Sequence, residues 1–178
     1  MFSKLLALGL GALAVVHAAP AFSFQTPLLS CSVNLDASIA PVKAFNAIPS
    51  GNYRIYNEAF GQRPLRVFGP DQAVWVGPEV PGDYAKWFIA PSGNPGSNEY
   101  IISNIGSKTG TKVTRGMVVS TAGKGDSFTI SPAGEGTYTI QIPNEDEVWT
   151  VNGGDSVSNV FLGREQGEIE SRWIFVPA

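Results

Sequence analysis

The chain ends on RWIFVPA (172–178), in which a tryptophan, a phenylalanine and a proline follow one another at steps of two. The same pattern of an aromatic residue, a large apolar residue and a proline occurs in WFIAP (87–91) and FTISP (128–132). Side chains two residues apart lie on the same face of a β-strand, and a proline removes one backbone donor, which helps to end the strand. The three stretches therefore predict three equivalent strands and an internal repeat.

Each of these endings has a matching beginning with the pattern Tyr-x-Ile. It occurs in NYRIYN (52–57), EYIISN (99–104) and TYTIQI (137–142). The tyrosine and the isoleucine share one face of a strand, and the residue between them faces outward. Three repeating units are predicted, and they run near 51–97, 98–135 and 136–178.

Each unit has room for two further strands between its beginning and its end. In the first unit, PLRVF (64–68) and AVWVG (73–77) flank the turn GPDQ, and in the second TKVTR and MVVST flank Gly116. In the third, EVWTV (147–151) and NVFLG (159–163) flank NGGDSVS. Four short strands repeated three times, without helices, predict an all-β chain with the β-trefoil fold.

In a β-trefoil the first and fourth strands of the three units close a six-stranded barrel, and the middle pairs form three hairpins that cap it. One unit cannot bury its apolar face alone, whereas three units together can. We therefore expect the repeated aromatic residues to fill one shared core. They are Tyr53, Tyr100, Tyr138, Trp87, Phe128 and Trp173.

The N-terminal residues are predicted to lie outside this fold. Lys4 precedes the apolar run LLALGLGALAVV (5–16), which is too short to span a bilayer and is typical of a secretory signal peptide. Residues 1–18 are therefore interpreted as a signal peptide, 19–50 as an extension or linker, and 51–178 as the trefoil domain. We expect a secreted, extracellular protein that does not insert stably into a membrane.

Composition excludes several classes of chemistry from the mature chain. The single histidine, His17, lies in the signal peptide, and the single cysteine, Cys31, has no partner for an internal disulfide. Without histidine there is no Ser/His/Asp or Cys/His nucleophile and no histidine-containing zinc site, and no phosphate-binding glycine motif is present. The acidic stretches at 144–149 and 164–171 are interpreted as solvated faces. We expect no enzyme activity, no cofactor and no metal.

The formal net charge of −3, without a basic cluster, also argues against a nucleic-acid partner. With enzymes and nucleic-acid binders excluded, the expected function is that of a rigid scaffold that binds a partner through its loops, where binding functions concentrate.

The strand sequences resemble those of the fungal β-trefoil serine protease inhibitors and, more distantly, the mushroom mycocypins, which inhibit cysteine proteases. The resemblance covers about residues 50–178. It rests on GNYRIYNEAFGQRPLRVFGPDQAVWV, KWFIAP, YIISN, YTIQIP and RWIFVPA. It implies an inhibitor of a protease, most readily a serine protease, that binds its target through an exposed β-hairpin loop; the family members are generally cytosolic, and secretion is expected here from the signal peptide alone.

In that family the loop between the second and third strands contacts the protease, which implies Gly69, Pro70, Asp71 and Gln72 here. An ordinary hairpin turn is the alternative interpretation of these four residues. A trypsin pocket requires Lys or Arg, so the turn of the second unit offers a second candidate, Arg115.

A carbohydrate-binding β-trefoil lectin is the alternative function, and a structural or effector role is a third. Ricin-type lectins carry Gln-x-Trp near the end of each unit, where this chain has AKWF, DSFT and SRWI. A lectin is expected to show a shallow site with an exposed aromatic residue beside Asp or Asn. The candidate aromatic residues are Trp75 and Trp149.

Overall fold

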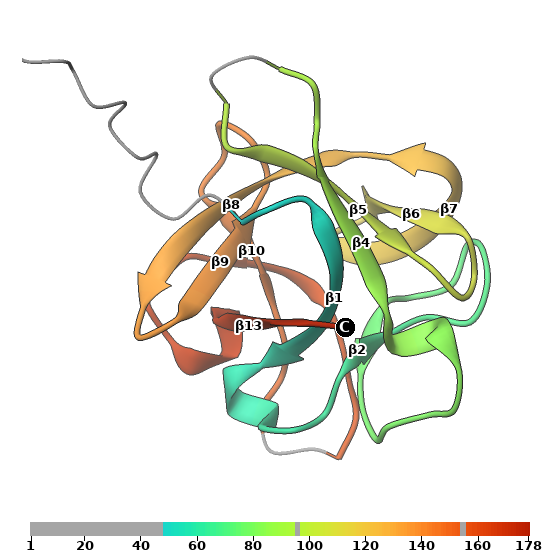
Figure 1. The fold of residues 1–178 in the computed structure, drawn as a ribbon. Helices are drawn as coiled ribbons and strands as arrows, with labels where there is room; N and C mark the ends of the chain where they lie inside the picture. Colours follow the sequence, from blue (N-terminus) through green and yellow to red (C-terminus); the bar gives the residue numbers. More distant parts are fainter. Residues whose placement is uncertain (1–47, 95–96, 154–155) are drawn as a thin grey trace, which may run out of the picture. The chain divides into compact units, whose positions relative to one another are not determined.

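The computed structural model describes residues 48–94, 97–153 and 156–178. The predicted signal peptide, Cys31 and the predicted extension up to residue 47 lie outside the described residues. The described part of the chain is all-β, and its helices are three short 3₁₀ turns (Figure 1). None of the described helices is long and apolar enough to cross a membrane.

The strands are β1 (Gly51–Asn57), β2 (Leu65–Arg66), β3 (Trp75–Val76), β4 (Trp87–Pro91), β5 (Glu99–Asn104), β6 (Thr109–Thr114), β7 (Met117–Gly125), β8 (Ser127–Gly134), β9 (Thr137–Gln141), β10 (Glu147–Thr150), β11 (Ser158–Asn159), β12 (Phe161–Arg164) and β13 (Trp173–Pro177). The 3₁₀ helices are η1 (Glu58–Phe60), η2 (Asp83–Ala85) and η3 (Ile169–Ser171).

Six strands form a closed antiparallel ring in the order β1, β4, β5, β8, β9 and β13, after which β13 pairs with β1. These are the strands predicted to begin and to end the three units. Figure 1 shows the last strand, β13 in red, beside β1, and the register places Ile55 opposite Phe175. The ring leaves its strands without a free edge, because each has a partner on both sides.

The repeated prolines end two of the three closing strands. β4 stops at Pro91 and β13 at Pro177, as predicted. In contrast, β8 continues beyond Pro132 to Gly134, with a register shift between these two residues. A bulge of this kind carries the strand past a residue that has no N–H to donate.

The middle strands form three hairpins, β2–β3, β6–β7 and β10–β12. Three fully buried valines join them through a cycle of backbone hydrogen bonds. The N–H of Val74 donates to the Val118 carbonyl (2.9 Å), that of Val118 to Val160 (3.0 Å), and that of Val160 to Val74 (2.8 Å). The third strands of the predicted units therefore meet around one point in matching register.

The described residues contain thirteen strands, not the twelve expected. The difference arises at Val160, which separates β11 from β12. Its N–H and carbonyl both take part in the valine cycle, so the predicted strand at 159–163 is interrupted where it turns from one neighbour, β3, to the other, β7.

The repeated aromatic residues form the core as predicted, with one exception. Trp87, Trp173, Phe128, Tyr100 and Tyr53 are buried. Tyr138 is half-buried and packs against this core, with its ring edge-on to Phe175 at 5.5 Å. The indole N–H groups of Trp87 and Trp173 donate to the carbonyls of Leu65 and Trp149, at 2.8 and 3.0 Å. Each tryptophan thereby satisfies its one donor inside the core.

Asn57, at the end of β1, is fully buried and holds η3 against β1. Its amide donates to the carbonyls of Glu170 (2.9 Å) and Arg172 (3.2 Å), and its oxygen accepts from the N–H of Ala59 (3.0 Å). The substitution Asn57→Ala leaves these groups without their partner, so we expect it to lower the free energy of unfolding by about 1–3 kcal/mol.

Urea denaturation measures this effect, and Asn52→Ala on the same strand is the control, because Asn52 is exposed. Equal stability of the two variants would contradict the structural role of Asn57.

Candidate functional site

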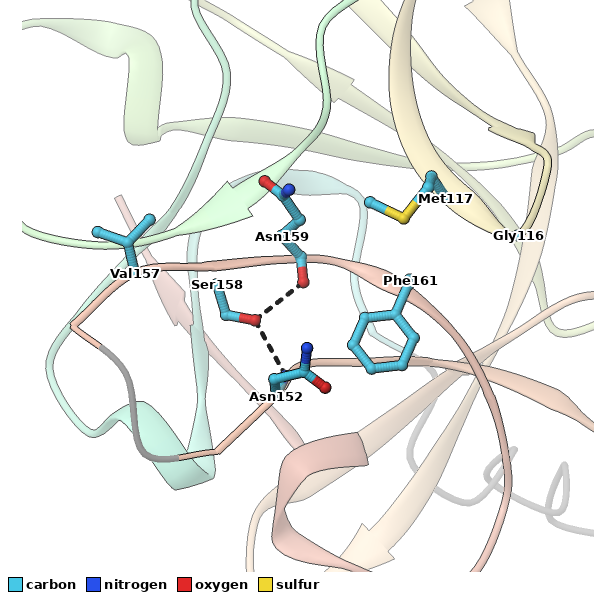
Figure 2. A pocket seen from close by; sticks show the side chains of 7 residues that line it. All are labelled: Gly116, Met117, Asn152, Val157, Ser158, Asn159 and Phe161. Atoms are coloured by element: carbon cyan, nitrogen blue, oxygen red, sulfur yellow. Dashed lines mark hydrogen bonds between the residues drawn. The ribbon is translucent and has the colours of Figure 1, made fainter.

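A shallow depression of about 560 Å³ lies where the tip of the β6–β7 hairpin meets the segment from β10 to β12 (Figure 2). The two parts are joined by pairing of Phe161 with Met117 and by a hydrogen bond from the Leu162 N–H to the Gly116 carbonyl (2.8 Å). The residues that line it are Gly116, Met117, Asn152, Val157, Ser158, Asn159 and Phe161. None of these is charged.

Ser158, which is buried, fixes the backbone of the depression. Its hydroxyl accepts from the Asn152 N–H (2.9 Å) and donates to the Asn159 carbonyl (3.0 Å), as Figure 2 shows. One side chain thus links the chain that leaves β10 to the chain that enters β12. The two asparagines hold their backbone positions without using their side-chain amides.

The side chains of Asn152 and Asn159 are exposed, and their amides form no hydrogen bond to any residue that the structure describes. Each amide offers two donors and one acceptor oxygen. Figure 2 shows the half-buried Phe161 ring and the Asn152 amide projecting into the same space. Among the described residues no other aromatic ring stacks on Phe161. The depression therefore combines one free aromatic surface with two free amides.

The two aromatic residues predicted for a lectin site lie elsewhere. Trp149 is fully buried, with its ring against Phe128 and Trp173, so the expectation that it is exposed is wrong. Trp75 is half-buried, and the Arg66 guanidinium covers it at 3.7 Å from the ring centroid. Its ring is thus already occupied by a cation–π contact.

Arg66 is a buried cation, and burial lowers the pKa of its guanidinium. It donates to the Pro78 carbonyl, and no carboxylate of the described residues pairs with it. The stacking on Trp75 therefore replaces a salt bridge at this position.

Phe161 and Trp75 occupy matching positions, each one residue after a valine of the hydrogen-bonded cycle. Phe161 could have been predicted from the sequence. AVWVG (73–77) and NVFLG (159–163) align residue by residue, so Phe161 is the counterpart of the candidate Trp75. The alignment does not show that Arg66 covers only the first of the two rings. That difference depends on side-chain packing.

The predicted inhibitory turn is held rigidly against β7. The Ser120 hydroxyl donates to the Gly69 carbonyl (2.5 Å) and accepts from the Gln72 N–H (3.1 Å), and the Asp71 N–H donates to the Ser120 carbonyl (3.0 Å). Pro70, Asp71 and Gln72 are exposed. Asp71 has φ of 56°, which is a left-handed turn conformation.

Arg115 lies at the exposed tip of the β6–β7 hairpin, away from the turn at 69–72 that packs on the middle of β7. Arg115 has φ of 52° and Gly116 has φ of 74°, as in a tight two-residue hairpin turn. The structure thus places the two sets of predicted inhibitory residues in separate turns. Gly116, next to Arg115, belongs to the depression.

The part of the chain that the structure describes contains no group of three or more His, Cys, Asp or Glu residues that could hold a metal ion.

No protein-family model matches the chain. No curated protein matches its sequence either. Solved structures do match. The agglutinin of Rhizoctonia solani is 18% identical, covers 75% of this chain and 99% of its own, and has a TM-score of 0.63. The protein is a β-trefoil.

Two further structures support the same fold. The ricin B-like lectin of Macrolepiota procera, solved in complex with lactose, is 18% identical and has a TM-score of 0.60. The match covers 75% of this chain and 100% of the lectin. ThreeFoil, a designed three-fold symmetric protein, is 16% identical with a TM-score of 0.63, and the match covers 72% and 99% of the two chains.

Proposed function

We propose that this protein binds carbohydrate, and that the depression around Phe161 is its binding site. The observation that carries the proposal is the free Phe161 ring beside the Asn152 amide, while the Asn159 amide lines the depression from the other side of the chain (Figure 2). Neither amide has a partner among the described residues. A sugar presents an apolar face of C–H groups and a rim of hydroxyls. The ring suits the face, and amides that both donate and accept suit the rim.

The order already present in the depression favours binding. Ser158 holds the backbone of both asparagines before any ligand arrives, so less conformational entropy is lost on binding. The similarity to an agglutinin and to a lectin solved with lactose supports the proposal at the level of fold. The fold alone does not select a ligand, so the argument rests on the side chains of the depression.

Three sequence-based predictions belong to the same proposal. We infer that the trefoil consists of three four-strand repeats, which the valine cycle supports. We also propose that the protein is secreted after loss of residues 1–18, and that it binds its ligand without chemical conversion.

A glycan array with the purified protein tests the proposed function. We expect saturable binding to a restricted set of glycans, competed by the free sugar. Absence of binding to every glycan on the array, by protein that remains folded by circular dichroism, would overturn carbohydrate binding.

Inhibition of a protease is a second candidate function, and one observation favours it. Ser120 holds the exposed turn Gly69–Gln72 rigidly, and a rigid loop binds a protease with little loss of entropy. However, a loop that occupies a protease cleft as a substrate does must be extended. The positive φ angles of Asp71 and Arg115 form tight turns instead. Carbohydrate binding is therefore the better supported function.

A panel of serine and cysteine proteases separates the two functions. We expect no stoichiometric inhibition of trypsin-like enzymes, because Arg115 lies in a tight turn and not in an extended segment. Inhibition that Arg115→Ala abolishes, or that replacement of residues 69–72 with Gly and Ser abolishes, would instead establish the protein as an inhibitor.

A further inference from the structure

A second depression adjoins the first and shares Phe161 with it. Its volume is about 360 Å³, and it is lined by residues of β10, of β12 and of the segment that leads to β13. Asn152 and Phe161 line both depressions. The two hollows are therefore parts of one surface that is continuous across this pair of side chains.

We propose that the ligand is a neutral glycan of at least two sugar residues, which occupies both depressions and crosses Phe161 between them. This inference rests on the proposed function and specifies its ligand class. The first depression supplies uncharged groups, and the second supplies Arg164, Gln166, Glu168 and Glu170.

The wall of the second depression is fixed by backbone contacts. The Glu170 carbonyl accepts from the buried Asn57 amide (2.9 Å) and from the Val151 N–H (3.3 Å). The Ser171 hydroxyl donates to the Glu168 carbonyl (2.9 Å). The segment that carries both carboxylates is thus held in place, which lowers the entropic cost of binding there.

Two glycines, Gly153 and Gly163, line the second depression. A Cβ atom at Gly163 would lie 2.7 Å from Thr150 Cγ2, and one at Gly153 would lie 2.8 Å from Glu170 Oε1. Side chains at these positions would have to push Thr150 and Glu170 out of their places. The hollow therefore depends mainly on the absence of a side chain at Gly163, because the Glu170 carboxylate is the end of a flexible side chain and can move aside.

The polar groups of the second depression suit hydroxyls. Arg164, Gln166 and Glu168 are exposed, and neither Arg164 nor Glu168 forms an ion pair with a described residue. The guanidinium can donate to ligand oxygens, and the carboxylates can accept from ligand hydroxyls. The acidic stretch 164–171, interpreted from the sequence as a solvated face, thus also borders the proposed site.

The charge of the second depression favours a neutral ligand. One guanidinium stands against two carboxylates, and the whole chain has a formal net charge of −3. An acidic sugar would gain one attraction and meet two repulsions at close range. A neutral sugar avoids this repulsion and uses donors and acceptors of both kinds.

Calorimetric titration with matched monosaccharides and disaccharides tests the inference on the full protein. The probes are galactose with lactose, N-acetylglucosamine with N,N′-diacetylchitobiose, and mannose with α-mannobiose. We expect the disaccharide of each bound pair to bind at least about tenfold more tightly, since the second sugar adds contacts in the second depression. 3′-Sialyllactose should bind no more tightly than lactose.

The variants Arg164→Ala and Gln166→Ala test whether the tighter binding of the disaccharide arises in the second depression. We expect each to reduce the advantage of the disaccharide severalfold while leaving the affinity for the monosaccharide within twofold. Lys108→Ala is the matched control, because Lys108 is an exposed cation in the β5–β6 turn and lines neither depression. It should change neither affinity.

The possible failures are distinguishable. Equal affinity for the members of every bound pair, unchanged by Arg164→Ala, would overturn the two-part site and leave carbohydrate binding standing. Tighter binding of 3′-sialyllactose than of lactose would overturn the neutral ligand class. Absence of binding to all six sugars and to the whole array would overturn the proposed function itself.

Discussion

The substitution Trp173→Ala is expected to lower the free energy of unfolding by about 3–5 kcal/mol. Trp173 is fully buried in β13, and its ring packs edge-on against Trp149 with centroids 6.2 Å apart. Alanine removes the ring from the shared core and leaves the Trp149 carbonyl without its 3.0 Å hydrogen bond. Both losses occur where β13 closes the ring between β9 and β1.

Chemical denaturation followed by far-ultraviolet circular dichroism measures this change. Phe88→Ala is the control, because Phe88 is an aromatic residue of β4 that is 43% exposed, and its loss should cost no more than about 0.5 kcal/mol. Trp173→Phe keeps a ring but loses the donor, so it should be intermediate. A Trp173→Ala protein as stable as Phe88→Ala would show that the repeated aromatic residues do not form the core.

The substitution Phe161→Ala is expected to weaken glycan binding by about 2–3 kcal/mol, which corresponds to roughly 30- to 150-fold in the dissociation constant. Phe161 lines both depressions and provides the only aromatic surface among the lining residues described for them. Alanine removes that surface while the backbone link through Ser158 remains. The fold should persist, since Phe161 is half-buried and lies outside the buried core cluster.

Titration of the sugar identified on the array measures the loss, with thermal unfolding as the check on folding. Phe161→Trp should retain binding, because it keeps an aromatic face at the same position. Phe88→Ala should bind as the unmodified protein does, since Phe88 lines neither depression. Undiminished binding by a folded Phe161→Ala protein would place the ligand elsewhere.

Much of the fold could be predicted from the sequence because the decisive pattern has a period of two. Residues such as Ile55 and Trp173 follow the alternation that places them in the core, and both are fully buried. The break at Val160 could not be predicted, since it arises from hydrogen bonds to valines far away in the chain. The burial of Trp149, a candidate exposed aromatic residue of the lectin alternative, could not be predicted either, because a single aromatic residue in a hairpin sequence does not reveal which face it occupies.

The candidate site was harder to predict, because it combines segments distant in sequence. Gly116 and Met117 reach the depression only through the pairing of β7 with β12. Phe161 and Trp75 are equivalent in sequence, but Arg66 covers only Trp75. The implied inhibitory loops were found as exposed turns, yet the left-handed conformation of Asp71 becomes apparent only from the backbone.

Nuclear magnetic resonance titration with the bound glycan tests the central claim most directly, because the side-chain amides of Asn152 and Asn159 report from inside the depression. We predict that these two NH₂ signals shift in proportion to saturation, together with the backbone signals of Gly116 and Phe161. Shifts confined to the exposed aromatic residues Phe68 and Tyr84, or to the turn Gly69–Gln72, with the two asparagine signals unmoved, would contradict the assignment of the site.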